Sequence, residues 1–331
     1  MPEVTRRPTI VDVARVARVS TATVSRVLNG RRVTDPELIR RVRLAAAELH
    51  YRPSGTARNL QAGVTRLIGV VVPDLRNPSF SELLGGLADA TAAQDHRLLV
   101  ADAKESPDEE RTLIQELALH CDGLVLCSPR LALDDLARFG RGPLVCTNRS
   151  VGDLPISSAG VDSYAGMAEV VRHLAGLGHR HIGYLAGPPT SWSDAERQRA
   201  LGDTAAGLRI RVTVEPAGST SDDGYRALPA LVAAGVSAVV AFNDLVAIGS
   251  LARMRERGFD VPGDISLAGF DDIPVAQFLA PPLTTVRLPT EEVGRRAWDL
   301  LWNQLTKAGR TGTVRLPTEL VVRASTGAAR A

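Results

Sequence analysis

Residues 20 to 29, Ser-Thr-Ala-Thr-Val-Ser-Arg-Val-Leu-Asn, place side chains that can bind DNA close to the start of a 331-residue chain. If this stretch is a helix that buries its valines and its leucine, the polar groups remain on the opposite side. An arginine can hydrogen-bond guanine through two groups, small residues can contact a thymine methyl group, and hydroxyl or amide groups can bind phosphates or base edges. The outward residues are then Thr21, Ala22, Ser25, Arg26 and Asn29.

A second group of polar and aromatic residues follows apolar, strand-like runs further along the chain. A site for a polar small molecule needs a stacking surface and a few well-placed hydrogen-bonding groups. Each member could instead be a helix cap or a turn residue, and Asp244 is expected to cap the helix that follows it. The group consists of Asp74, Phe80, Asn148, Trp192, Ser193, Arg197, Phe242, Asn243 and Asp271.

The sequence does not contain the motifs of common enzyme classes. It has no Gly-x-Ser-x-Gly elbow and no phosphate loop, and VVPDLRNPSF stands where a dinucleotide-binding protein would carry its glycines after the first strand. Cys121, Cys127 and Cys146 lack the spacing of metal ligands, and His120 beside Cys121 is a single pair. We therefore expect a protein that is not an enzyme, with free thiols and with no metal or cofactor.

Charge is distributed unevenly along the chain. Residues 1–63 contain 12 arginines, no lysine and five acidic residues, which gives a net charge of +7, whereas the remainder carries −5. A basic segment on an acidic protein predicts that this segment binds a polyanion. No apolar run reaches the length of a membrane span and the first residues carry charges, so the sequence predicts a soluble, cytoplasmic protein associated with the nucleoid.

Three short helices are expected in the basic segment. Thr9 and Asp12 have the spacing of a capping box for a helix of about eight residues, Ser20 suits the N-cap of a second helix, and Thr34 to Glu37 resembles another capping box. Two short helices joined by a tight turn and braced by a third form a helix-turn-helix, whose second helix enters the major groove. A small helical bundle with an ordinary polar face is the alternative.

From residue 67 onward, apolar strands alternate with amphipathic helices. This alternation predicts an α/β fold of doubly wound parallel sheets, arranged as two lobes that bind ligands at the carboxyl ends of their strands. The expected strands are 67–72, 97–102, 123–127, 143–147, 181–187, 212–216, 237–242, 264–270 and 314–323, and the expected helices lie near 80–94, 108–120, 194–207, 223–234, 244–257 and 290–305.

The segments TIVDVARVARVSTATVSRVLNG (9–30) and YRPSGTARNLQAG (51–63) closely resemble the lac repressor and galactose repressor (LacI/GalR) family of bacterial transcription regulators. The resemblance continues through the rest of the chain and implies a body like that of periplasmic binding proteins. It also implies a head at 1–52, a hinge helix and linker at 53–64, and a body at 65–331. Lobe 1 would be about 65–161 plus 290–318, and lobe 2 about 162–289 plus 319–331.

The resemblance further implies a homodimer that reads a pseudo-palindromic operator and responds to a small effector held between the lobes. Leu60 matches the hinge leucine that the family inserts into the minor groove, although it could instead pack between domains. Gly55 departs from the bulkier residue of many members and weakens the hinge helix. The residues expected at DNA are Thr9, Ser20, Thr21, Ala22, Thr23, Ser25, Arg26, Asn29, Tyr51, Ala57 and Leu60.

In the body, Phe80 and Phe242 resemble family residues that sandwich a ring. Asn148, Asp162, Arg197, Asn243 and Asp271 resemble those that bind hydroxyl groups or polar ring atoms. This chemistry suits a sugar or a nucleoside, although an arginine can also bind a phosphate or a carboxylate. Two alternatives stay open, namely a sugar-binding protein of transport type and a DNA-binding protein whose body binds no ligand. Whether an effector releases DNA or promotes its binding does not follow from the sequence.

Overall fold

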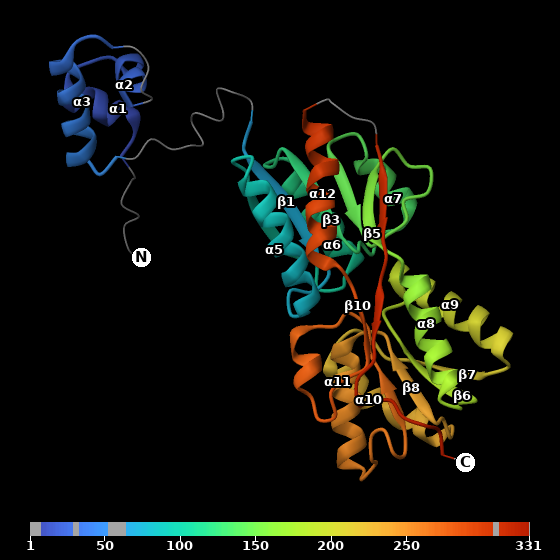
Figure 1. Ribbon diagram of the computed structural model, residues 1–331. Coiled ribbons are helices and arrows are strands. Elements are labelled where there is room, and N and C mark those ends of the chain that lie inside the picture. Colours follow the sequence, from blue (N-terminus) through green and yellow to red (C-terminus); the bar gives the residue numbers. More distant parts are fainter. Residues whose placement is uncertain (1–7, 29–32, 52–63, 307–310, 331) are drawn as a thin grey trace. The chain divides into compact units, whose positions relative to one another are not determined.

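The computed structural model describes residues 8–28, 33–51, 64–306 and 311–330 (Figure 1). The chain divides into two compact units, Met1–Thr65 and Arg66–Ala331, which are called the head and the body below. No helix among the described residues is long and apolar enough to cross a lipid bilayer.

The head is built from α1 (Ile10–Ala17), α2 (Thr21–Leu28) and α3 (Pro36–Glu48). Thr9 caps α1 through the predicted capping box with Asp12. The prediction of a second capping box at Thr34 is wrong, because the N-cap of α3 is Asp35, whose carboxylate accepts hydrogen bonds from two amides of the first turn. The centre of the head is apolar, and its fully buried members, one from each helix, are Val13, Val24 and Val42.

Lobe 1 of the body is a parallel sheet with strand order β11-β5-β4-β3-β1-β2. Side chains alternate between its two faces. One face packs on α5 and α12 through residues such as Leu83, and the other packs on α6 and α7 through residues such as Ile114. The bounds are β1 Leu67–Val72, α5 Pro78–Ala92, β2 Arg97–Asp102, α6 Pro107–Ala118, β3 Gly123–Cys127, α7 Leu133–Phe139, β4 Leu144–Thr147, β5 Ser157–Val161, α12 Thr290–Leu305 and β11 Thr313–Leu316.

Lobe 2 is a second parallel sheet, with strand order β7-β6-β8-β9. Helices α8 and α9 cover one face, and α10 and α11 cover the other. The bounds are α8 Ser163–Gly176, β6 His181–Ala186, α9 Trp192–Leu208, β7 Arg211–Pro216, α10 Ser221–Ala233, β8 Ala238–Ala241, α11 Asp244–Glu256 and β9 Ser266–Ala268, followed by the 3-10 helix η1 Pro274–Phe278.

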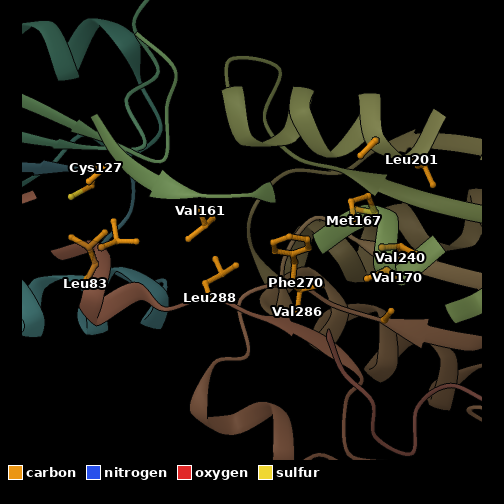
Figure 2. Packing of buried hydrophobic residues seen from close by; sticks show 14 of the residues in the cluster. Leu83, Cys127, Val161, Met167, Val170, Leu201, Val240, Phe270, Val286 and Leu288 are labelled. Atoms are coloured by element: carbon orange, nitrogen blue, oxygen red, sulfur yellow. The ribbon is translucent and has the colours of Figure 1, made fainter. Parts of the chain in front are cut away.

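The chain passes between the lobes at β5–α8, at β10 (Thr285–Arg287) to α12, and at β11 to β12 (Glu319–Val321). Strands β10 and β12 pair antiparallel. Apolar side chains continue through this crossover: Figure 2 shows Val161 and Leu288 between the lobe 1 residue Leu83 and the lobe 2 residues Phe270 and Val286. The two lobes therefore share one hydrophobic cluster beside the crossing segments.

The fold class predicted from the sequence is confirmed, and most expected strands agree with the structure to within two residues. Strands β5 and β10 and helices α7 and α8 were not predicted from the sequence. Strand β5 reads Ser-Ser-Ala-Gly-Val, which lacks the run of β-branched and aromatic residues by which strands are recognised. It forms because it adds to an existing sheet, between β4 and β11.

Candidate functional site

Helix α2 displays part of the predicted DNA-reading surface. Val24 and Val27 are buried against the head core, which leaves Thr21, Ala22 and Arg26 exposed on the opposite side of the helix. This is the orientation that base contact requires.

The other predicted DNA contacts have varied positions. The Ser20 hydroxyl accepts a hydrogen bond from the Thr23 amide at 3.2 Å and caps α2, and the Thr9 hydroxyl donates to Asp12 at 2.7 Å. Tyr51 packs partly on the head core. Ser25 is half-buried on α2. Asn29, Ala57 and Leu60 lie outside the described residues.

A cleft in the body gathers side chains from the strand ends of both lobes. It is lined by eight of the ten residues that the sequence suggested for an effector, while Asp162 and Trp192 lie outside its lining. The eight are Asp74, Phe80, Asn148, Ser193, Arg197, Phe242, Asn243 and Asp271.

Arg197 and Asp271 form the charged centre of the cleft. Their closest atoms, Nη2 and Oδ1, are 3.7 Å apart, and both side chains are more than nine-tenths buried. The guanidinium lies 3.6 Å from the centroid of the Phe270 ring and 5.0 Å from that of Phe242. Burial raises the pKa of Asp271 to about 6, and the charge of Arg197 opposes this rise. The Asn77 side chain of lobe 1 also hydrogen-bonds this carboxylate.

The first turn of α9, one turn before Arg197, is hydrogen-bonded to β6 and to the loop that follows β6. Asp194 is buried, and its Oδ1 accepts hydrogen bonds from the Tyr184 hydroxyl at 2.7 Å and from the Gly187 amide at 2.8 Å. Gly187 leaves room for an aromatic neighbour, because a Cβ at this position would lie 2.5 Å from the Phe242 ring. The Phe242 ring thus packs against Gly187, and the Arg197 guanidinium donates a hydrogen bond to the Phe242 carbonyl at 2.5 Å.

The lobe 1 wall of the cleft carries a second arginine, Arg130, which was not predicted from the sequence. Arg130 is buried, and its guanidinium donates to Glu105 at 2.5 and 3.0 Å and to the Ser128 carbonyl at 2.7 Å. Asp74 is already bound to Arg76 through both of its carboxylate oxygens. The buried Oδ1 of Asn148 has no hydrogen-bond partner among the described residues, which leaves an acceptor free for a ligand.

The two predicted effector residues outside the cleft lining lie at the starts of helices. Asp162 is the N-cap of α8 and accepts a hydrogen bond from Arg315 at 3.0 Å, and Trp192 begins α9. The expectation that Asp244 caps α11 is wrong: the cap is Asn243, whose Oδ1 accepts from the Val246 amide at 2.9 Å. Asp244 is instead fully buried and accepts hydrogen bonds from Thr285 and Ile273.

Further cleft residues are small and polar and sit at helix caps or strand ends, where such residues are common in any protein. This is why composition alone did not single them out. They are Asn77, Ser79, Ser128, Ser163, Ser191 and Ser219.

The three cysteines are free, and burial raises the pKa of the Cys121 thiol to about 11 and those of Cys127 and Cys146 to about 12. They are therefore protonated at neutral pH. Within the described ranges, no three His, Cys, Asp or Glu side chains are grouped so that they could hold a metal ion.

Comparison with known proteins gives consistent matches for both units. The family of bacterial regulatory proteins of the lacI type matches residues 9–54, and the periplasmic binding protein-like domain matches residues 171–326. The HTH-type transcriptional repressor CytR of Escherichia coli (strain K12) is 33% identical over 331 residues, which cover 97% of this chain and 96% of the relative.

Solved structures agree with this assignment. A lac repressor dimer bound to operator and the anti-inducer ONPF matches with a TM-score of 0.84 at 27% identity, covering 98% of this chain and 100% of the other. A complex of the transcriptional regulator CelR with cellobiose matches with a TM-score of 0.71 at 30% identity, covering 96% and 100%.

A helix-turn-helix head joined to a two-lobed body with a polar interlobe cleft defines a DNA-binding regulator of the ligand-responsive type. The chain belongs to the LacI family, and it is a transcriptional repressor whose DNA binding is controlled by an effector. The relatives are repressors, not enzymes.

Proposed function

We propose that this repressor acts as a homodimer on a pseudo-palindromic operator in the bacterial nucleoid, and that a neutral sugar or nucleoside is its effector. The observation that carries the effector class is the buried Arg197–Asp271 pair beside the Phe242 and Phe270 rings. A guanidinium and a carboxylate side by side offer hydrogen-bond donors and acceptors to hydroxyl groups, and a flat ring packs against an apolar sugar or base face. The relatives named above include one solved with cellobiose.

Charge balance favours a neutral effector in this cleft. Arg197 is paired with Asp271, Arg130 with Glu105, and Asp74 with Arg76. An anionic ligand would have to compete with a carboxylate for either arginine. A ligand with several hydroxyl groups can bridge such pairs without separating them.

Ligand entry requires a change in the cleft. Its free volume is about 40 Å³, whereas pockets for small molecules typically measure about 300–1,000 Å³. Contacts between the lobes, such as Asn77 with Asp271 and the Ser193 hydroxyl with the Asn148 carbonyl at 3.1 Å, hold the cleft narrow. We infer that the lobes separate to admit the effector and close around it, which is the motion that would be transmitted to the head.

Exposed apolar side chains support the homodimer. Leu75 and Leu99 in lobe 1 are 44% and 43% exposed, and Val275 and Phe278 in lobe 2 are 42% and 78% exposed. Leu99 lies on β2, the edge strand of its sheet, and an exposed edge is a surface on which a second chain can pack. We propose that a second copy covers these residues.

We also propose the domain bounds given by the sequence: the head at 1–52, the hinge and linker at 53–64, and the body from 65. The division of the chain into compact units at Thr65 supports the start of the body. Sheet membership supports the lobe assignment, because β11 joins the first sheet while β12 pairs with β10 on the other side of the crossover.

Base reading by α2 can be tested with Arg26→Ala. Loss of the exposed guanidinium is expected to weaken operator binding by about 1–3 kcal/mol and to relax the preference at one base position of each half-site. Binding to randomised operator sequences, measured at fixed salt, checks this. Arg15→Ala on the exposed side of α1 is the matched control, and it should not alter base preference. Equal weakening on every sequence would make Arg26 a phosphate contact instead.

The effector can be sought by thermal shift with sugars and nucleosides on the full-length protein. A ligand present at 100 times its Kd stabilises the body by about 2.7 kcal/mol. A sugar or nucleoside that raises the Tm of the wild type but not that of Arg197→Ala is the expected result. No shift with any compound of these classes would favour the alternative that the body is a dimerisation scaffold without a ligand.

A further inference from the structure

A second, larger cavity lies beside the effector cleft and shares Asn148 and Val161 with it. Its volume is about 580 Å³, which is within the usual range for small-molecule sites. Arg197 and Asp271 do not belong to its lining. The annex, as we call this cavity, is lined by Asn148, Arg149, Ser150, Val151, Gly152, Ser158, Gly160, Val161, Trp192, Glu196, Arg199, Thr313, Val314 and Arg315.

We propose that the annex is a binding site for the phosphate group of a small metabolite. Three arginines line it against one carboxylate, that of Glu196. Guanidinium groups bind phosphate and carboxylate through paired, charge-assisted hydrogen bonds, which makes clustered arginines the usual partners of these groups.

Two of these arginines converge on one atom although they come from different lobes. Arg199 on α9 and Arg315 on β11 each place Nη2 near Oε2 of Glu196, at 2.8 and 3.8 Å. Arg315 also binds Asp162 at 3.0 Å. Both arginine side chains are about half exposed, so their free N–H groups can reach a ligand in the annex.

The third arginine supplies a positive charge that is not in direct contact with a carboxylate. Arg149 is half-buried, and its Nη1 donates to the Pro129 carbonyl at 3.3 Å. Among the described residues, its buried Nε has no hydrogen-bond partner. The nearby buried carboxylate of Glu110 attracts the guanidinium but forms no ion pair with it. A cation in this position is costly unless an anion or an acceptor reaches it. An oxyanion in the annex would satisfy it.

The other residues that line the annex indicate which kind of metabolite fits there. Trp192 lines the annex instead of the effector cleft, and its indole offers a flat surface for a sugar or base ring. Because Arg149 and Arg315 belong to lobe 1 and Arg199 belongs to lobe 2, an occupant contacts both lobes. An annex ligand would thereby favour the closed body and couple to the effector cleft.

The test is titration of inorganic phosphate into the full-length protein by isothermal calorimetry, at constant ionic strength set with chloride. Saturable binding is expected to the wild type, and Arg149→Ala and Arg199→Ala should each weaken it about tenfold. Glu196→Gln removes the competing carboxylate and should strengthen it. Arg295→Ala is the matched control, because Arg295 is also about half exposed and bound to an acid on its own helix but lies on α12. It should bind like the wild type.

A second arm identifies the source of the oxyanion. If ribose 5-phosphate binds more tightly than phosphate and loses this advantage in Arg197→Ala, the annex receives the anionic end of a ligand whose ring is in the cleft. If Arg197→Ala binds both compounds as the wild type does, the annex binds its metabolite independently of the cleft, and this result stands even if the proposed effector class is wrong.

The proposal is overturned if phosphate binds no better than chloride, or if Arg149→Ala, Arg199→Ala and Glu196→Gln leave its affinity unchanged while their circular dichroism shows folded protein.

Discussion

Arg197→Ala is expected to abolish effector binding and to destabilise the body by about 3–5 kcal/mol at pH 8, with a smaller loss at pH 5. The guanidinium is the partner of Asp271, whose carboxylate is more than nine-tenths buried. Removal of one member of a buried ion pair leaves the other charge uncompensated. It also removes the contacts of the guanidinium with the Phe242 and Phe270 rings, a loss that does not depend on pH.

The pH dependence follows from the pKa of Asp271. Burial holds this pKa at about 6 in the folded wild type, above the ordinary value of 3.8. A carboxyl group with a raised folded pKa contributes stability that is complete below its unfolded pKa and is lost as pH rises through the folded value. Because Arg197 lowers this pKa, its removal raises the pKa further. The difference between variant and wild type is therefore small near pH 5 and grows above pH 6.

Urea unfolding at pH 5, 6.5 and 8 measures this difference, and calorimetry with the effector found by thermal shift measures binding. The double variant Arg197→Ala/Asp271→Asn is the control, since it has no buried charge to compensate and should show no widening of the gap above pH 6. An equal loss of stability at all three pH values would mean that Arg197 contributes through packing alone.

The cleft residues could be identified from the sequence more readily than the contacts that they make with one another. Arg197 and Asp271 were both expected to bind an effector, because each follows a strand in an α/β pattern. That they pair with each other depends on the return of the chain through β9, 74 residues later, and no local pattern reports such a contact. Arg130 was missed for a similar reason, since its role is defined by Glu105 on a different loop.

Local rules also failed where tertiary structure decides the outcome. Strand β5 has few strand-forming residues and is held by its neighbours β4 and β11. At the start of α11, Asn243 and Asp244 are both good capping residues, and the choice between them follows from Thr285 and Ile273, which bind Asp244. The long apolar strands and the capped helices of the head were predictable because their signals are contained within a few residues.

Gly249→Ala is expected to destabilise the body by about 3 kcal/mol, whereas replacing a helical glycine by alanine ordinarily stabilises a protein. Alanine is a better helix former than glycine by about 1 kcal/mol, so propensity alone predicts stabilisation in the middle of α11. However, a Cβ at Gly249 would lie 1.7 Å from the Ser221 carbonyl oxygen of α10, and one at Gly224 of α10 would lie 2.0 Å from the Val246 carbonyl oxygen. Backbone atoms cannot move aside as a flexible side chain can, so the two helices must separate.

Gly202→Ala in α9 is the matched control, because Gly202 is an exposed helical glycine and a Cβ added there would have no neighbouring atom within 4 Å. It should raise the free energy of unfolding by about 0.5–1 kcal/mol. Urea unfolding of both variants checks that the free energy of unfolding falls in Gly249→Ala and rises in Gly202→Ala.

Gly249→Ala also has a consequence for regulation, because α11 begins directly after Phe242 and Asn243 in the cleft. Separation of α10 from α11 displaces this wall, so Gly249→Ala should weaken effector binding as well, whereas a stabilised Gly249→Ala protein would show that the two helices tolerate a wider spacing.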